Sequence, residues 1–150
     1  DLASPGFIGV RQTEFDVRAQ VTLSFDPRDT CDFAGLTVYH TNEHHYDLGV
    51  QLVNEQRCCV LRKRVGDMQV EMGYVPLEVG VPVHLRIEAD KTLYCFYAGT
   101  SDGDMKLIGT GRTQLLSTEC MVMTFTGCFI GLFAQGNECA FFSDFSVEYY

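Results

Sequence analysis

The sequence predicts an all-β fold, a β-sandwich or β-barrel of short antiparallel strands. The strongest observation is residues 14–25, where apolar and polar side chains alternate strictly, a period of two that fits a strand and no helix. The second is a series of about ten short segments separated by turn residues, which is typical of sandwiches and barrels. The third is that 150 residues with 46% hydrophobic side chains can bury one core.

Residues 14–25 form the first strand that the pattern predicts. Its apolar side chains share one face and are Phe15, Val17, Ala19, Val21, Leu23 and Phe25. The residues between them are polar or charged, so one face is expected to be buried and the other solvated, as in an antiparallel sheet. Residues 26–29 contain proline and two aspartates and predict the turn that follows.

Turn residues separate the remaining predicted strands, for example at 41–43, 66–67 and 99–104. The strands are expected at 34–40, 45–53, 57–65, 68–75, 82–89, 92–98, 105–109, 127–134 and 140–149. Residues 113–119 are the one segment with a helical pattern, and they allow little more than one turn. Since the sequence contains no repeat, linker or low-complexity segment, residues 1–150 are predicted to form a single β-sandwich domain.

Composition and charge exclude several classes of partner. With a net charge of −9 and a pI near 4.7, the chain lacks the clustered Lys and Arg that bind nucleic acid, and an acidic membrane surface is disfavoured for the same reason. No stretch approaches the roughly 18 apolar residues that a membrane span needs. A neutral ligand such as a sugar, or another protein, remains open as the partner.

The N-terminus and the cysteines bear on the chain's origin. Residues 1–5 have neither an initiating Met nor a signal-like core, so the chain is expected to be a piece of a larger one.

The seven cysteines, an odd number, are at 31, 58, 59, 95, 120, 128 and 139. Several occupy apolar strand positions, where a free thiol behaves as a small hydrophobe. They favour reduced cysteines over a disulfide framework and a reducing compartment, most simply a bacterial cytoplasm.

The sequence gives only weak signals for a catalytic or metal-binding site. Most acidic residues alternate outward or lie in turns, so no catalytic residue is expected. His44 and His45 are adjacent on a predicted strand and point to opposite faces, which argues against a joint metal site. The sequence indicates no cofactor. Three acids near one turn leave two possibilities open, a calcium site and a solvated turn. They are Asp26, Asp29 and Asp32.

The basic residues 62–64 and the apolar segment 120–127 each leave two interpretations open. Arg62 and Arg64 are expected to share one face of a strand, with Lys63 opposed to them; a charged sheet face and a salt-bridged contact with another domain both remain open. Residues 120–127 carry an apolar series into Thr-Phe-Thr-Gly. From the pattern alone, Phe125 is either a core residue at a strand entry or a projecting side chain that docks elsewhere.

The chain resembles the C-terminal β-sandwich domain of glycoside hydrolase family 43 β-xylosidases. The order and spacing of several blocks carry the resemblance: Pro5–Gly9 with Arg11 and Gln12, Ala34–Tyr39, His45 and Tyr46, Val60–Val65, Leu85–Ala89, Leu115–Glu119, Phe125–Gly127 and Ile130–Leu132. It implies a two-sheet antiparallel jelly roll of the concanavalin A-like type. The family domain normally begins further upstream, which implies a missing early strand and an exposed edge.

The resemblance also implies a function. In the family a separate five-bladed β-propeller carries the catalytic acid and base and hydrolyses xylo-oligosaccharides, and a Phe on a loop of the sandwich helps close the substrate pocket. Phe125 matches that Phe, although Met121–Thr124 stand where the family is usually glycine-rich. This chain is therefore expected to be a non-catalytic accessory domain whose partner is the propeller of its parent chain. Homo-oligomerisation remains open.

Two other functions are alternatives to the accessory role. A self-sufficient lectin-like module would need exposed aromatic rings in a line on one sheet, and the sequence has no Trp and only scattered Tyr. An independent hydrolase would need two carboxylates facing one site, whereas the alternation of the clearest strands puts their acids outside.

Overall fold

The computed structural model describes residues 6–101, 103–113 and 128–150, and this part of the chain is all β. Its eleven strands are β1 (Gly6–Arg11), β2 (Val17–Ser24), β3 (Phe33–Thr41), β4 (His44–Val53), β5 (Gln56–Val65), β6 (Met68–Pro76), β7 (Val83–Ala89), β8 (Leu93–Gly99), β9 (Lys106–Arg112), β10 (Phe129–Gln135) and β11 (Phe141–Tyr149). Within the described ranges no helix has the length and hydropathy to span a membrane.

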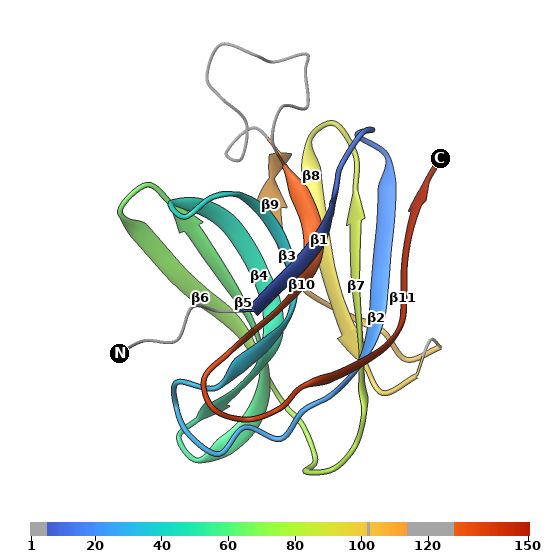
Figure 1. The fold of residues 1–150 in the computed structure, drawn as a ribbon. Coiled ribbons are helices and arrows are strands. Elements are labelled where there is room, and N and C mark those ends of the chain that lie inside the picture. The colour runs from blue at the N-terminus through green and yellow to red at the C-terminus, as the bar shows by residue number, and fades with distance from the viewer. Residues whose placement is uncertain (1–5, 102, 114–127) are drawn as a thin grey trace.

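The strands form two antiparallel sheets that face each other as a sandwich (Figure 1). The six-stranded sheet has the order β1-β10-β3-β4-β5-β6, and the five-stranded sheet has the order β11-β2-β7-β8-β9. Sequential hairpins build β3 to β6 and β7 to β9, whereas β10 and β11 return to the first strands of the chain. The predicted two-sheet antiparallel β-sandwich is confirmed.

The core lies between the two sheets and follows the alternation of the strands. Side chains from the two central strands of the five-stranded sheet are almost completely buried there: Val17, Ala19, Val21 and Leu23 of β2, and Val83, Leu85, Ile87 and Ala89 of β7. Each fully buried Val, Leu or Ile side chain among them stabilises the fold by about 1.5–3 kcal/mol relative to exposure. The period of two seen in the sequence is therefore the pattern of core burial.

The observed strands differ from the prediction mainly at the start of the chain. β1 was not predicted, because Gly6 and Gly9 interrupt its short apolar series. β2 begins at Val17 rather than at residue 14, since the segment before it bends where the Gln12 side-chain amide donates to the Glu14 carbonyl (2.9 Å). Of the expected helical turn at 113–119, all but Thr113 lies outside the described residues.

A β-bulge changes the register of β11. Pairing with β2 shifts between Ser143 and Ser146, and Asp144 adopts a left-handed backbone conformation (φ 56°). Aspartate tolerates this conformation better than most residues. The inserted residue brings both Phe145 and Val147 onto the core side of the strand, where they pack as half-buried side chains.

Candidate functional site

Phe125 lies outside the described residues, in the segment 114–127 that joins β9 of one sheet to β10 of the other. The structure does describe both bases of that segment. One base is Arg112 and Thr113 at the end of β9, and the other is Cys128 just before β10. What holds these bases in place is the structural basis for any role of the segment.

Three hydrogen bonds fix the base on the β9 side. The buried Tyr46 hydroxyl donates to the Arg112 carbonyl (2.7 Å), and the Thr113 backbone N–H donates to the Thr92 carbonyl (2.9 Å). The Thr113 hydroxyl donates to the Asp90 carbonyl (3.2 Å). Burial raises the pKa of Tyr46, so its hydroxyl stays protonated and remains a donor at any physiological pH.

The base on the β10 side is held by Gln12, whose side chain is buried. The Gln12 backbone N–H donates to the Cys128 carbonyl (3.0 Å), and its side-chain carbonyl accepts from the Tyr94 hydroxyl (2.8 Å). Tyr94 packs edge-on against Tyr46, with ring centroids 6.0 Å apart, which links the two bases through the core. A buried partner left unsatisfied here costs about 1–3 kcal/mol.

Aromatic rings lie beside this end on the outer face of the six-stranded sheet. We call Phe7, Tyr39 and Phe129 the aromatic collar. The Phe7 and Tyr39 rings are 5.7 Å apart, and Phe129 is the direct cross-strand partner of Tyr39. Phe7 and Phe129 are 42% and 37% exposed, so the collar offers apolar surface next to the base of the segment that carries Phe125.

The rest of this outer face is filled by its own side chains. The nearly buried Asp47 accepts a hydrogen bond from the Thr37 hydroxyl (2.7 Å) and lies 2.9 Å from His45 Nδ1. The Arg62 guanidinium lies 4.3 Å from the centre of the buried Phe33 ring. The charged groups near the centre of this face therefore contact other side chains of the same sheet.

The structure places the adjacent residues of the sequence motifs apart. His45 is near Asp47, whereas His44 is 3.3 Å from the Thr41 hydroxyl, so the two histidines have different partners. Arg62 and Arg64 do share the outer face, while the Lys63 ammonium reaches the Thr110 carbonyl (3.0 Å) on the opposite sheet. β5 is an interior strand, so these charges do not protect a sheet edge.

None of the described cysteines forms a disulfide, and the buried ones are structural. Cys59 lies in the core, where burial raises its pKa to about 12, and burial raises the pKa of Cys128 to about 11. Cys58 is buried on the outer face of the sheet. The thiols of these three residues therefore behave as small apolar groups.

The three acids considered for calcium each have partners within the protein. Asp32 accepts backbone hydrogen bonds from Arg28, Asp29 and Asn137 (2.9–3.0 Å). Asp26 accepts one from the Gly80 N–H (3.0 Å). Among the described residues no group of three or more His, Cys, Asp or Glu side chains is arranged around a metal position. Calcium binding stays a prediction.

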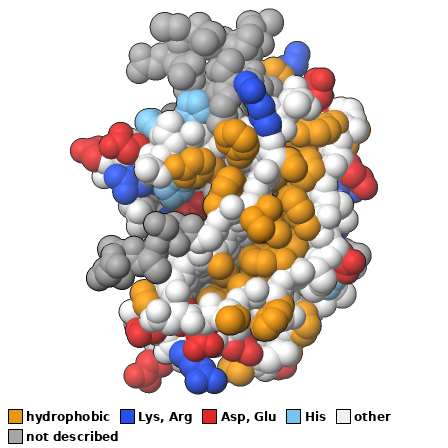
Figure 2. Space-filling model, in the orientation of Figure 1, with side chains coloured by type: hydrophobic (Ala, Val, Ile, Leu, Met, Phe, Trp, Pro, Cys, Tyr) orange, Lys and Arg blue, Asp and Glu red, His pale blue; other side chains and the backbone are white. Residues whose placement is uncertain are grey.

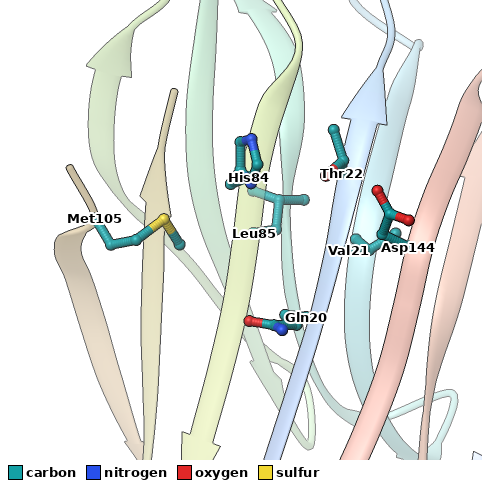
Figure 3. A pocket seen from close by; sticks show the side chains of 7 residues that line it. All are labelled: Gln20, Val21, Thr22, His84, Leu85, Met105 and Asp144. Atoms are coloured by element: carbon teal, nitrogen blue, oxygen red, sulfur yellow. The ribbon is translucent and has the colours of Figure 1, made fainter. Parts of the chain in front are cut away.

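A shallow pocket of about 170 Å³ lies on the outer face of the five-stranded sheet (Figure 3). Its polar lining comes from adjacent strands and consists of Gln20, Thr22, His84 and Asp144, with Met105 at one side. A glycosidase site needs two carboxyl groups. Asp144 supplies the single carboxyl among the residues that line this pocket.

Sequence reasoning missed the buried groups that organise the site. Gln12, Tyr46 and Tyr94 act through contacts between strands distant in sequence. Tyr46 lies in the strand expected at 45–53, but its hydroxyl partner depends on the tertiary structure. For Asp47 the sequence holds one signal. Asp47 and Gly49 alternate onto the same outer face of the strand, so the carboxylate lies beside a position without side-chain bulk.

Comparison with known proteins shows which family the chain belongs to. Residues 1–148 match the family described as "Beta xylosidase C-terminal Concanavalin A-like domain". The non-reducing end alpha-L-arabinofuranosidase BoGH43B of Bacteroides ovatus is 37% identical over 134 residues, which cover 89% of this chain and 25% of that protein. A xylosidase/arabinosidase of Butyrivibrio fibrisolvens is 24% identical over 91% of this chain.

Solved structures agree in fold. The chain "Bacteroides ovatus Xyloglucan PUL GH43B" superposes with a TM-score of 0.84 at 33% identity, covering 96% of this chain and 29% of that one. The xylan beta-1,4-xylosidase of Bacillus halodurans gives a TM-score of 0.86 at 24% identity, covering 97% and 30%. The chain spans about a quarter of the length of the curated relatives that it matches. It belongs to the family of C-terminal concanavalin A-like domains found in glycoside hydrolase family 43 enzymes.

Proposed function

We propose that this chain is a non-catalytic accessory domain of a β-xylosidase or arabinofuranosidase. It packs on the catalytic β-propeller of its parent chain and helps close the substrate pocket through Phe125. Its membership of a C-terminal domain family and the names of its relatives support the enzyme class. The observation that carries the proposal is that buried hydrogen bonds hold both bases of the segment 114–127 beside an exposed aromatic collar.

A lid residue needs a base that does not move. Tyr46 and Tyr94 supply this base, because each combines a ring packed in the core with a hydroxyl bonded to the backbone or to Gln12. An apolar ring at the mouth of a sugar-binding pocket excludes water and offers a face to the pyranose ring. The collar residues Phe7 and Phe129 then provide contact area for the propeller around the same end.

The chemistry belongs to the propeller in this proposal. Within the described ranges, the nearly buried Asp47 is already bonded to Thr37, and Asp144 is the one carboxyl in its pocket. Neither arrangement provides the acid and base that glycoside hydrolysis needs. Xylo-oligosaccharides are therefore substrates of the parent enzyme, and this domain meets them only at the rim of the pocket.

A lectin-like module is the second candidate. The collar favours it, since two of its rings are more than one-third exposed. The Phe33 ring argues against it, because this ring is buried under the Arg62 guanidinium and offers no free face to a sugar. The balance supports the accessory role.

The test is Phe125→Ala in the full-length enzyme. We expect kcat/KM on xylobiose to fall about tenfold, which corresponds to about 1.4 kcal/mol of lost transition-state stabilisation. The matched control is Phe141→Ala, which truncates a 70% exposed ring on the outer side of β11 and should leave kcat/KM unchanged. Circular dichroism should show both variants folded. Wild-type kinetics for Phe125→Ala would remove the lid role.

A further inference from the structure

Three connections between the sheets lie together at the end of the sandwich that is opposite to the two bases of the segment 114–127 (Figure 1). They are residues 25–32 between β2 and β3, residues 77–82 between β6 and β7, and residues 136–140 between β10 and β11. Figure 2 shows acidic and basic side chains beside hydrophobic ones at this lower end of the molecule. The aromatic collar lies at the other end, so this end is separate from the proposed lid.

Arg57, the second residue of β5, holds two of these connections from the interior. Its side chain is 2% exposed. Nε donates to the Phe25 carbonyl (2.9 Å), and Nη1 donates to the Glu78 carbonyl (2.6 Å). The Asp26 carboxylate lies 3.3 Å from Nε. A buried charge of this kind needs partners for its donors, because an unpaired donor loses its hydration without compensation.

The guanidinium of Arg57 has more donors than the protein uses. Its five N–H groups have three partner residues in the described part of the chain, namely Phe25, Asp26 and Glu78. Arg57 also lines a pocket of about 290 Å³, to which all three connections contribute lining residues. The buried cation therefore has N–H groups left for an acceptor that enters this pocket.

The other charged groups of the pocket are balanced. Arg28 lines the pocket from the first connection and lies 3.5 Å from Glu138, which lines it from the third. Asp26 accepts from the Gly80 N–H (3.0 Å) in addition to its contact with Arg57. Both carboxylates thus have partners, whereas the arginines keep free donors. The pocket suits one negative charge rather than two, because a second charge would be repelled by Asp26 and Glu138.

Part of the pocket lining is apolar. Phe25, Val81 and Phe141 contribute to it, and the Phe141 ring is 70% exposed. Apolar side chains beside a cationic group favour a ligand that joins a carboxylate to an apolar body. A pocket of about 290 Å³ is at the small end of the range for ligand sites, so the ligand must be compact.

We propose that this pocket binds a small organic monocarboxylate, with its carboxylate at Arg57 and Arg28 and its apolar body against Phe141. Carboxylate oxygens accept charge-assisted hydrogen bonds from guanidinium groups, and these bonds are about twice as strong as those between neutral groups. Neutral sugars such as xylobiose lack such a group and are not expected to bind here. The proposal goes beyond the accessory role and depends neither on Phe125 nor on the propeller.

The first test uses benzoate as the probe and the full-length protein. Ligand-observed saturation-transfer NMR at constant ionic strength should give a saturable signal with a Kd of about 1 mM, since a ligand of so few atoms has a low ceiling on affinity. Benzamide has the same ring without the charge and should bind about tenfold more weakly. Inorganic phosphate should not displace benzoate. The absence of a saturable benzoate signal, equal binding of benzamide or displacement by phosphate would overturn the proposal.

The second test locates the site with variants of the full-length protein. Arg28→Gln removes an 83% exposed guanidinium, so the fold should persist while benzoate binding weakens about fivefold. The matched control Arg18→Gln breaks a similar pair with Glu88 (2.6 Å) on the outer face of β2 and β7 and should leave the affinity unchanged. Arg57→Gln should abolish binding. It also removes bonds that hold two connections, so Arg28→Gln decides the outcome if Arg57→Gln does not fold. Wild-type affinity in Arg28→Gln, or an equal loss in Arg18→Gln, would contradict this location.

Discussion

Asp32 shows how one buried carboxylate connects two turns of the chain. Its oxygens accept from the backbone N–H groups of Arg28 and Asp29 in one turn and of Asn137 in another (2.9–3.0 Å). Burial alone would raise the pKa of Asp32, but these hydrogen bonds stabilise the charged form and lower the pKa overall. From the sequence, Asp32 was a candidate calcium ligand. The sequence does not show that backbone N–H donors surround its carboxylate.

The prediction at this position concerns stability. Asp32→Ala leaves the three N–H groups without their acceptor and should lower the free energy of unfolding by about 2–3 kcal/mol. The control Asp29→Ala removes a carboxylate that accepts from the exposed Thr30 N–H, and it should cost less than about 1 kcal/mol. Urea unfolding at pH 7 measures both. Equal losses would show that Asp32 does not have this special role.

The pH dependence of Asp32 follows from the same shift. Its pKa is lowered in the folded state, so the stabilisation is fully present above the unfolded value of about 3.9 and is lost as the pH falls through the folded value. The gap in stability between the wild type and Asp32→Ala should therefore narrow below about pH 4. A constant gap down to acid pH would contradict this assignment.

At the scale of the elements, close approach between the sheets depends on glycine at β9. Gly111 lies under the ring of Tyr46, and an added Cβ would be 2.7 Å from two ring carbons. That ring also positions the hydroxyl that holds the Arg112 carbonyl. The packing of Gly111 against Tyr46 therefore affects the position of the β9-side base of the segment 114–127.

Gly111→Ala should overpack this contact and lower the free energy of unfolding by about 1–3 kcal/mol. The control is Gly103→Ala in the loop before β9, where an added Cβ meets no heavy atom within 4 Å. In the full-length enzyme Gly111→Ala should also lower kcat/KM on xylobiose, because it displaces Tyr46 from the base. Thermal unfolding and kinetics measure the two effects, and wild-type stability for Gly111→Ala would show that the Tyr46 ring moves without cost.

How far the sequence predicted each element depended on what covers its faces. β2 and β7 alternate clearly because one face packs in the core and the other is solvated. Residues 33–38 of β3 are buried on both faces, so their pattern is continuous rather than alternating. β1 escaped prediction because Gly6 and Gly9 interrupt its short apolar series. The bulge at Asp144 and the burial of Asp47 depend on tertiary contacts that no local pattern encodes.

At the scale of the whole molecule, the fold separates a closed interior from an apolar surface at one end of the sandwich. The aromatic collar lies beside the two described bases of the segment 114–127, and its Phe7 and Phe129 rings are 42% and 37% exposed. This surface is proposed to meet the propeller. A surface used in that way is a protein contact area and not a sugar-binding platform.

This distinction predicts the outcome of a titration. The domain, expressed without the propeller, should show no localised, saturable NMR shifts with xylobiose or xylotetraose up to about 10 mM, a weaker affinity than about −3 kcal/mol. The reason is that the rings nearest the sheet centre, Phe33 and Phe133, are buried, and Phe7 and Phe129 stand at one rim. Saturable shifts centred on Phe7, Tyr39 and Phe129 would instead establish a lectin-like site at the collar. Phe129→Ala would abolish such shifts, while Phe141→Ala would preserve them.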